Sequence, residues 1–345
     1  VDRFAEAGLR AFGPSAAAAR LEGSKAFTKA FLARHRIPTA RYRVCTGLAE
    51  ACAYIDECGA PIVIKADGLA AGKGVVVAGD VNEAKEAARD MLSGSAFGPA
   101  GERIVIEEFL AGEEASFIAV VGDGVVLPLA SSQDHKALGD GDTGPNTGGM
   151  GAYSPAPVVD AAMHERIMRE IAEPTVRALE ADGLPYVGFL YAGIMVGTDG
   201  MPRVLEYNCR GGDPETQPIL MRLRSDLTVL CEAAIDGRLG EHTASWDERF
   251  ALGVVMAAGG YPAAYAKGET IEGLDAGAPD TKVFHAGTRP GGGGVVTDGG
   301  RVLCVCALGV TASDAQSRAY ARVNDIRWPN AYYRTDIGYR AVARE

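Results

Sequence analysis

Short apolar runs alternate with amphipathic stretches along the first two thirds of the chain. Apolar runs of four to nine residues are typical of strands, and apolar residues at i, i+3 and i+4 are typical of helices. The runs predict strands at residues 42–45, 61–66, 74–78, 103–109, 115–121, 125–130, 188–196 and 203–208. The amphipathic stretches predict helices that begin after Ser24, Gly47 and Asp80, at 161–181, and around Leu227–Ala234. The pattern therefore predicts a mixed α/β (α+β) fold.

Two regions depart from this alternation. Residues 131–157 are rich in Gly, Asp, Thr and Pro and show little periodicity, so they are predicted to form a long loop. A loop of that length inside a compact domain usually has a function. From Phe250 onward, short strands and glycine turns precede a helix near residues 312–324, which predicts a separate small domain.

Composition narrows the class of protein. The chain has 345 residues and a net charge of −11, which makes nucleic acid a poor partner because an acidic protein repels phosphate backbones. Its seven cysteines form no CxxC pair, which argues against a disulfide framework or a zinc knuckle. No apolar run approaches the roughly 18 residues of a membrane span. We therefore expect a cytoplasmic protein without nucleic-acid or membrane partners.

The segment from Ile62 to Val75 carries the first candidate chemistry. An apolar strand ends in Lys65, a loop of small residues follows with Gly68, Gly72 and Lys73, and a strand begins again at Gly74. Glycines let the backbone approach phosphate oxygens, and lysines supply positive charge. The spacing differs from a P-loop, so a strand–loop–strand flap over phosphates fits better. The alternative is a plain hairpin with two solvated lysines, and in either case Lys65 should not be a core residue.

Two further strands end in polar residues. The strand at 104–109 ends in Glu107 and Glu108, which predicts an adenine and ribose site or, alternatively, a solvated acidic strand end. In the strand at 203–208, alternation places Glu206 and Asn208 on one face, with Arg210 following on that face. Both are oxygen ligands of the kind that Mg²⁺ accepts. The alternative is a polar strand end without a ligand.

The order of these segments, a phosphate flap, an adenine strand and a metal strand, is that of an ATP-grasp fold. The chain resembles the phosphoribosylamine–glycine ligase family over nearly its whole length. The resemblance rests on Lys65–Val75, Glu107–Glu114, Ser132–Lys136, the D-T-G-P-N-T-G-G-M-G run at 142–151, and Glu206–Gln217. The segments 254–262, 282–288 and 299–309 resemble the C-terminal domain of that family.

The resemblance implies a role for each matching residue. Arg210, Lys65 and Asp213 would be catalytic, and Glu206 and Asn208 would bind Mg²⁺ or Mn²⁺. ATP would be bound by Lys25, Lys65, Gly68, Gly72, Lys73, Gly74, Glu107, Glu108, Phe109, Leu110 and Glu114. The other substrates would be bound by Asp134, Lys136, Asp142, Thr143, Gly144, Asn146, Thr147, Gly148, Gly149, Arg210 and Asp213, with His135 beside them.

The family's activity would be the ATP-dependent ligation of glycine to phosphoribosylamine through glycyl phosphate, in purine biosynthesis. No side-chain nucleophile is needed, so neither Cys209 nor His135 is read as one. The resemblance implies an N-terminal remnant at 1–14, an ATP-grasp domain at 15–240 with a flap subdomain at about 45–112, and a C-terminal domain at 241–345. The expected state is a monomer or a weak homodimer.

Two departures from the family pattern leave alternatives open. The usual N-C-R-F-G-D has Gly211 in place of the bulky residue, so the loop that aims Arg210 would be looser. Most of the family's N-terminal domain would also be missing, and we then expect poor turnover of the full reaction. The alternatives are another ATP-grasp carboxylate–amine ligase and a nucleotide-binding remnant without full activity, with a nucleic-acid-binding module a distant third.

Overall fold

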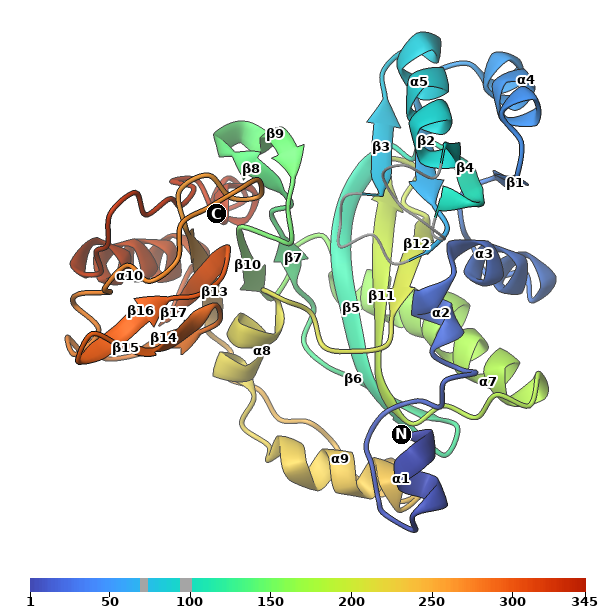
Figure 1. Cartoon of the computed structure of the whole chain (residues 1–345). Helices are drawn as coiled ribbons and strands as arrows, with labels where there is room; N and C mark the ends of the chain where they lie inside the picture. The colour runs from blue at the N-terminus through green and yellow to red at the C-terminus, as the bar shows by residue number, and fades with distance from the viewer. Residues whose placement is uncertain (69–73, 94–100) are drawn as a thin grey trace. The chain divides into compact units, whose positions relative to one another are not determined.

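A computed structural model describes residues 1–68, 74–93 and 101–345. The chain divides into two units. The first comprises residues 1–128, 160–211 and 227–243, and the second comprises 129–159, 212–226 and 244–345. Each unit has its own sheets, so each is described by itself (Figure 1). No helix in the described ranges is both long and apolar enough to cross a bilayer.

Antiparallel sheets form the centre of the first unit. One sheet has the strand order β1-β4-β2-β3, with β1 at Tyr42–Cys45, β2 at Ile62–Ala66, β3 at Val75–Ala78 and β4 at Ile104–Glu108. The other has the order β12-β11-β5-β6, with β5 at Gly112–Gly122, β6 at Val125–Pro128, β11 at Gly188–Gly197 and β12 at Pro202–Asn208. The strands predicted for this part of the sequence are therefore present, with ends shifted by a few residues.

Three helices of the first unit have the caps that the local sequence predicts. Ser24 caps α3 by accepting from the Phe27 N–H, Asp80 caps α5, and Gly59 follows α4 with φ 74°. The helices are α1 (Asp2–Glu6), α2 (Arg20–Gly23), α3 (Lys25–Arg34), α4 (Leu48–Cys58), α5 (Val81–Leu92), α6 (Ala161–Ile167), α7 (Glu173–Ala181) and α9 (Leu227–Ile235). A π-helical segment, Met168–Ala172, joins α6 to α7.

Each sheet of the first unit buries one face under helices. Ile62 and Ile64 of β2 lie in one apolar cluster with Ile104 and Ile106 of β4 and with Ile55 of α4, and Figure 1 shows α4 and α5 beside this sheet. In the other sheet, the Tyr207 hydroxyl is hydrogen-bonded to Thr175 of α7. Since side chains alternate along a strand, the remaining positions of β2, β4 and β12 point to the opposite faces.

The second unit is built on a five-stranded sheet of order β14-β17-β13-β10-β7. Leu252 and Val254 of β13 pack with Ala315 and Ala319 of α10 in its main core. The strands are β7 (Gln133–Asp134), β8 (Ala137–Gly139), β9 (Thr143–Asn146), β10 (Gly151–Ser154), β13 (Phe250–Ala257), β14 (Thr281–His285), β15 (Thr288–Gly291), β16 (Gly294–Thr297) and β17 (Arg301–Gly309). The helices are α8 (Thr216–Arg222), α10 (Ala312–Asp325) and α11 (Tyr339–Val342).

The prediction of an unbroken loop at 131–157 is wrong. The segment forms β7 and β10, which pair with each other at Ala152↔Asp134, and a separate hairpin of β8 and β9 that pairs at Ala137↔Asn146. These strands have two to four residues, which is too short for a periodic pattern to emerge from the sequence. Strands β15 and β16 pair with each other as a further hairpin.

Candidate active site

The alternation of β2 and β4 sends charged side chains to the face opposite α4 and α5. Val63 pairs with Glu107 in the register, and Lys65 is the next residue of β2 on the same face. The Glu107 carboxylate lies 3.0 Å from the Lys65 ammonium. A strand that reads I-V-I-K-A thus supplies both the apolar core and one residue of a polar site.

Lys65 is only 6% exposed, and Glu107 only 2%. The expectation that Lys65 is not a core residue is therefore wrong. The reason is that Glu107 compensates its charge and that Lys65 Nζ donates to the Leu205 carbonyl oxygen of β12 at 3.3 Å. The Glu107 Oε1 atom is buried and lies 3.0 Å from Lys65 Nζ without hydrogen-bond geometry, and a carboxylate oxygen has a lone pair left for one more donor.

Lys25 opens α3 beside the predicted flap. Its Nζ donates to the Gly68 carbonyl oxygen at 3.2 Å, and its N–H donates to the Asp67 carbonyl oxygen. Burial lowers the pKa of Lys25, while the negative charge of Glu206 opposes this shift. Lys25, Lys65 and Glu206 therefore belong to one electrostatic environment in the first unit.

The base of the flap is fixed by the buried carboxylate of Asp67. It accepts from the Ala26 N–H at 2.7 Å and from the Ser24 hydroxyl at 2.9 Å, and it is paired with Arg103. At the other end, the Gly74 carbonyl oxygen accepts from the Ala66 N–H. Gly72 and Lys73, which we predicted to contact ATP, lie outside the described residues.

The predicted metal residues share one face of β12. Glu206 pairs with Gly193 of β11, and Asn208 pairs with Tyr191. A Cβ atom built on Gly193 would lie 3.5 Å from the Glu206 side chain and 3.7 Å from the Glu114 carboxylate, so Glu114 of β5 lies next to Glu206. A glycine at position 193 leaves room above the sheet between these acidic side chains.

The donor set at this place fits a Mg²⁺ ion that keeps waters and phosphate ligands. Glu206 offers carboxylate oxygens, and Asn208 offers an amide oxygen. Arg210 donates to this same Asn208 Oδ1 atom at 3.1 Å and to Glu22 at 3.0 Å, so Arg210 lies beside Asn208. Within the described ranges, no group of three or more His, Cys, Asp or Glu side chains could hold a metal by itself.

The remaining predicted ATP residues lie at the end of β4. Glu108 accepts from the Arg41 N–H at 2.9 Å and from its guanidinium at 2.7 Å, so its carboxylate already has protein partners. Phe109 is 43% exposed and Leu110 is partly exposed. Their contact with a nucleotide remains a prediction.

In the second unit, the substrate residues predicted at 134–149 lie on short paired segments. The Lys136 carbonyl oxygen accepts from both the N–H and the hydroxyl of Thr147, and the Thr147 hydroxyl accepts from the Gly149 N–H at 3.0 Å. Gly149 has φ 109°, and a Cβ there would lie 2.4 Å from the Pro214 ring. Only glycine suits this turn.

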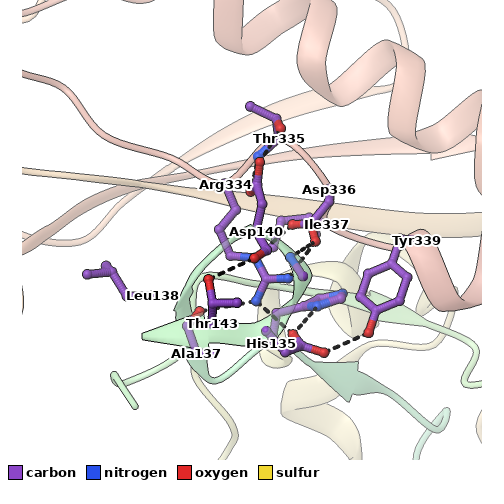
Figure 2. A network of polar contacts seen from close by, with 12 residues as sticks. His135, Ala137, Leu138, Asp140, Thr143, Arg334, Thr335, Asp336, Ile337 and Tyr339 are labelled. Atoms are coloured by element: carbon purple, nitrogen blue, oxygen red, sulfur yellow. Dashed lines mark hydrogen bonds and ion pairs between the residues drawn. The ribbon is translucent and has the colours of Figure 1, made fainter. Parts of the chain in front are cut away.

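The Asp142 carboxylate, which is 27% exposed, is the centre of a polar network. Figure 2 shows three side chains of this network, His135, Arg334 and Tyr339. Arg334, which is fully buried, donates to it at 2.9 Å, Tyr339 donates at 2.7 Å, and Arg340 also pairs with it. His135 Nδ1 is 3.6 Å away, which is too long for a hydrogen bond. These groups hold the pKa of Asp142 well below its usual range.

His135 is neutral in this network. Its Nε2 accepts from the Gly338 N–H at 2.9 Å, so the ring proton sits on Nδ1 and faces Asp142. Burial lowers the pKa of His135 below its ordinary value. The ring therefore serves as an acceptor that anchors the start of α11.

Arg301 links the glycine-rich turn to Asp213. Its guanidinium donates to the carbonyl oxygens of Gly148 at 2.6 Å and of Asp213 at 2.8 Å, and to the Asp213 carboxylate at 2.9 Å. The Tyr261 hydroxyl accepts from the Gly148 N–H at 3.0 Å. All of these residues belong to the second unit.

Sequence reasoning missed Arg301, Tyr261 and Arg334. Tyr261 and Arg301 lie in segments that resemble the family, but their contacts with Gly148 and Asp213 join residues more than 80 positions apart, as does the contact of Arg334 with Asp142. The signal that was available is weak: an arginine at the start of an apolar strand, as in G-G-R-V-L at 299–303. Only the fold shows which loops such an arginine reaches.

Comparison with known proteins identifies the class. Residues 23–216 match the family described as phosphoribosylglycinamide synthetase, ATP-grasp (A) domain, and residues 251–340 match its C domain. The biotin carboxylase domain of 2-oxoglutarate carboxylase from Hydrogenobacter thermophilus shares the fold, with a TM-score of 0.75 at 17% identity over 96% of this chain and 72% of that one. The chain thus has the ATP-grasp fold, as predicted.

Relatives at higher identity define the family within that class. A phosphoribosylamine–glycine ligase from Allochromatium vinosum is 64% identical over all of this chain and 81% of its own length, and one from Vibrio cholerae is 62% identical over the same shares. The crystal structure of the Thermotoga maritima enzyme has a TM-score of 0.88 at 38% identity, covering 94% of this chain and 81% of that one. The chain belongs to the phosphoribosylglycinamide synthetase family.

The Asp142 network predicts acid sensitivity of the second unit. Asp142 has a lowered pKa in the folded state, so its stabilising effect is present above pH of about 4 and is lost below. The pKa of His135 is lowered in the folded state, so the unfolded state binds a proton more readily. The free energy of unfolding therefore also falls as the pH drops below the ordinary histidine pKa of about 6.5. Asp142→Asn should lower the free energy of unfolding at pH 7 by about 3 kcal/mol, because the buried Arg334 loses a partner.

Thermal unfolding measured from pH 7 to pH 3 checks this expectation. The loss of stability below pH 5 should be shallower in the Asp142→Asn variant than in the wild type. Asp298→Asn is the matched control, because Asp298 is 43% exposed and lies 3.6 Å or more from its cationic partners. Equal effects of the two substitutions would contradict the assignment of Asp142 as the centre of this network.

Proposed function

We propose that this chain ligates glycine to 5-phosphoribosylamine, with cleavage of ATP, and so forms glycinamide ribonucleotide, ADP and phosphate in de novo purine biosynthesis. The observation that carries the proposal is that Lys65 Nζ donates to the Leu205 carbonyl oxygen on β12, the strand whose one face carries Glu206 and Asn208. The family membership and the names of the relatives support it. A cytoplasmic location and a monomeric or weakly dimeric state belong to the same proposal.

The first step transfers the γ-phosphoryl group of ATP to a glycine carboxylate oxygen, which gives glycyl phosphate and ADP. Positioning and neutralisation of charge dominate such a transfer. Lys25 and Lys65 bind phosphate oxygens, and Glu107 Oε1 accepts from an amino or hydroxyl group of the nucleoside. Glu206 and Asn208 hold Mg²⁺ or Mn²⁺, and when bound the metal neutralises phosphate charge.

In the second step, the amine nitrogen of phosphoribosylamine attacks the glycyl carbonyl carbon and phosphate leaves. Arg210 is 55% exposed and lies next to Asn208, so it is available to stabilise the anionic acyl phosphate. Asp213 and the segment 142–149 receive glycine and the amine. The Gly148 N–H and the Asp213 carboxylate are already oriented by Tyr261 and Arg301.

The reaction itself is the first test. Incubation with Mg·ATP and glycine, with hydroxylamine as a trap for glycyl phosphate, should release ADP and form glycine hydroxamate. Addition of phosphoribosylamine should yield glycinamide ribonucleotide. The same assay with a panel of other amino acids is the control. ADP release that depends on a different acid would show another ATP-grasp ligase, and none with any acid would show a nucleotide-binding remnant.

The metal assignment predicts a shift in Mg²⁺ dependence. Glu206→Gln replaces a charged oxygen ligand by a neutral one, so the Mg²⁺ concentration for half-maximal ADP release should rise by about tenfold or more. The melting temperature without metal should stay nearly unchanged. Glu50→Gln, on the exposed face of α4, should leave the Mg²⁺ dependence as in the wild type. An identical Mg²⁺ titration for Glu206→Gln would remove Glu206 from the metal site.

Arg301 should affect the use of glycine but not the binding of ATP. Arg301→Met removes hydrogen bonds from a charged donor, each worth roughly 1.5–3 kcal/mol, so we expect kcat/KM for glycine to fall about 10- to 100-fold. ATP binding to the first unit should not change, and Arg301→Lys should restore part of the loss. The control is Arg289→Met, because the Arg289 side chain is 52% exposed. A parallel loss of ATP affinity would contradict this role.

A further inference from the structure

A second lysine lies beneath the proposed nucleotide site. Lys29 is one helical turn after Lys25 on α3 and is only 2% exposed. Its Nζ lies 2.7 Å from Glu107 Oε2 and 2.7 Å from the Thr39 hydroxyl oxygen. Burying an ammonium group is costly unless it is paired and hydrogen-bonded, and both conditions are met here.

The contacts of Lys29 close a ring through β12. The Thr39 hydroxyl, which accepts from Lys29, donates to the Val204 carbonyl oxygen at 2.6 Å. On the other side, Glu107 is paired with Lys65, and Lys65 donates to the carbonyl oxygen of Leu205, the next residue of β12. The ring therefore ties α3, β2 and β4 to the strand that carries Glu206 and Asn208.

The charges of the ring show what Lys29 does. Glu107 is shared by two ammonium groups, so the ring carries a net positive charge. The Lys29 ammonium is already engaged by Glu107 Oε2 and by the Thr39 hydroxyl, whereas Lys65 lies at the end of β2 that leads into the predicted flap. Without Lys29, the Glu107 carboxylate would be neutralised by Lys65 alone. Lys65 would then be held toward Glu107 and would be less available to phosphate.

We propose that Lys29, together with Thr39, is a positioning residue for the nucleotide: it neutralises Glu107 from below, so that Lys65 is free to bind phosphate and Glu107 Oε1 to accept from the nucleoside. This inference rests on the proposed ATP site. It adds a residue that does not touch the ligand and that no sequence motif revealed.

The charge state of Lys29 gives the inference a distinctive signature. The groups that face it are Glu107 and Glu108 from β4, Lys65 from β2 and the Thr39 hydroxyl. Burial lowers the pKa of Lys29 to about 8, against the opposing effect of the Glu107 carboxylate. Because the proton is lost as the pH rises through 8, ATP binding should weaken between pH 7 and pH 9.

Calorimetric titration of the whole chain with ATP and Mg²⁺, without glycine or amine, tests this. Lys29→Met should raise the dissociation constant at pH 7 by about tenfold. Lys29→Arg keeps its charge at every accessible pH, so its affinity at pH 7 should stay near that of the wild type and weaken less toward pH 9. Any pH dependence of ATP affinity that remains in the Lys29→Arg variant is due to other groups, Lys25 among them. Thr39→Val should weaken binding a few-fold.

The control is Lys85→Met, which removes an ion-paired lysine from α5, outside the ring. It should bind ATP as the wild type does. If Lys29→Met does not fold, Lys29→Arg and Thr39→Val decide the question. Unchanged affinity and an unchanged pH profile in the folded variants would overturn the role of Lys29 alone. Absence of ATP binding by the wild type would overturn the proposed site and this inference together.

Discussion

The buried carboxylate of Glu107 is the interaction on which the first unit's site depends. At 2% exposure, an uncompensated carboxylate would be strongly destabilising, and both Lys29 and Lys65 lie within ion-pair distance of it. This pairing fixes α3 against β2 and β4. The lysine that we propose to bind phosphate is consequently part of the folded core, and its place is set before any ligand arrives.

In the second unit, a buried arginine pairs with the acidic side chains. Arg334 is fully buried, and its guanidinium reaches Asp142, Asp336 and the Ala137 carbonyl oxygen. The planar, forked guanidinium can satisfy several acceptors at once, which an ammonium on a flexible stem does less well. Short strands such as β8 and β9 have few backbone hydrogen bonds of their own. Their geometry therefore depends on side chains that come from residues almost 200 positions later.

The sequence predicted most of the elements because local rules agree with the final fold. Strand alternation in I-V-I-K-A and in L-E-Y-N separates core positions from site positions, and the pairing of Glu206 with Gly193 and of Asn208 with Tyr191 follows it. What failed were features that depend on distant residues. The burial of Lys65 could not be predicted, because its counter-charge and its carbonyl acceptor lie 42 and 140 residues away.

The same reasoning explains why the sequence predicts the nucleotide residues more fully than the residues around glycine and the amine. Lys25, Lys65 and Glu107, which are proposed for the nucleotide, lie on a capped helix and on regular strands, where a local pattern specifies the direction of each side chain. Residues proposed for glycine and the amine lie on turns, where direction is set by contacts such as those of Arg301 and Tyr261. A catalytic group on a loop needs such support to hold its geometry. Sequence motifs can therefore locate the loops proposed for glycine and the amine. The residues that hold these loops in place are identified only by the fold.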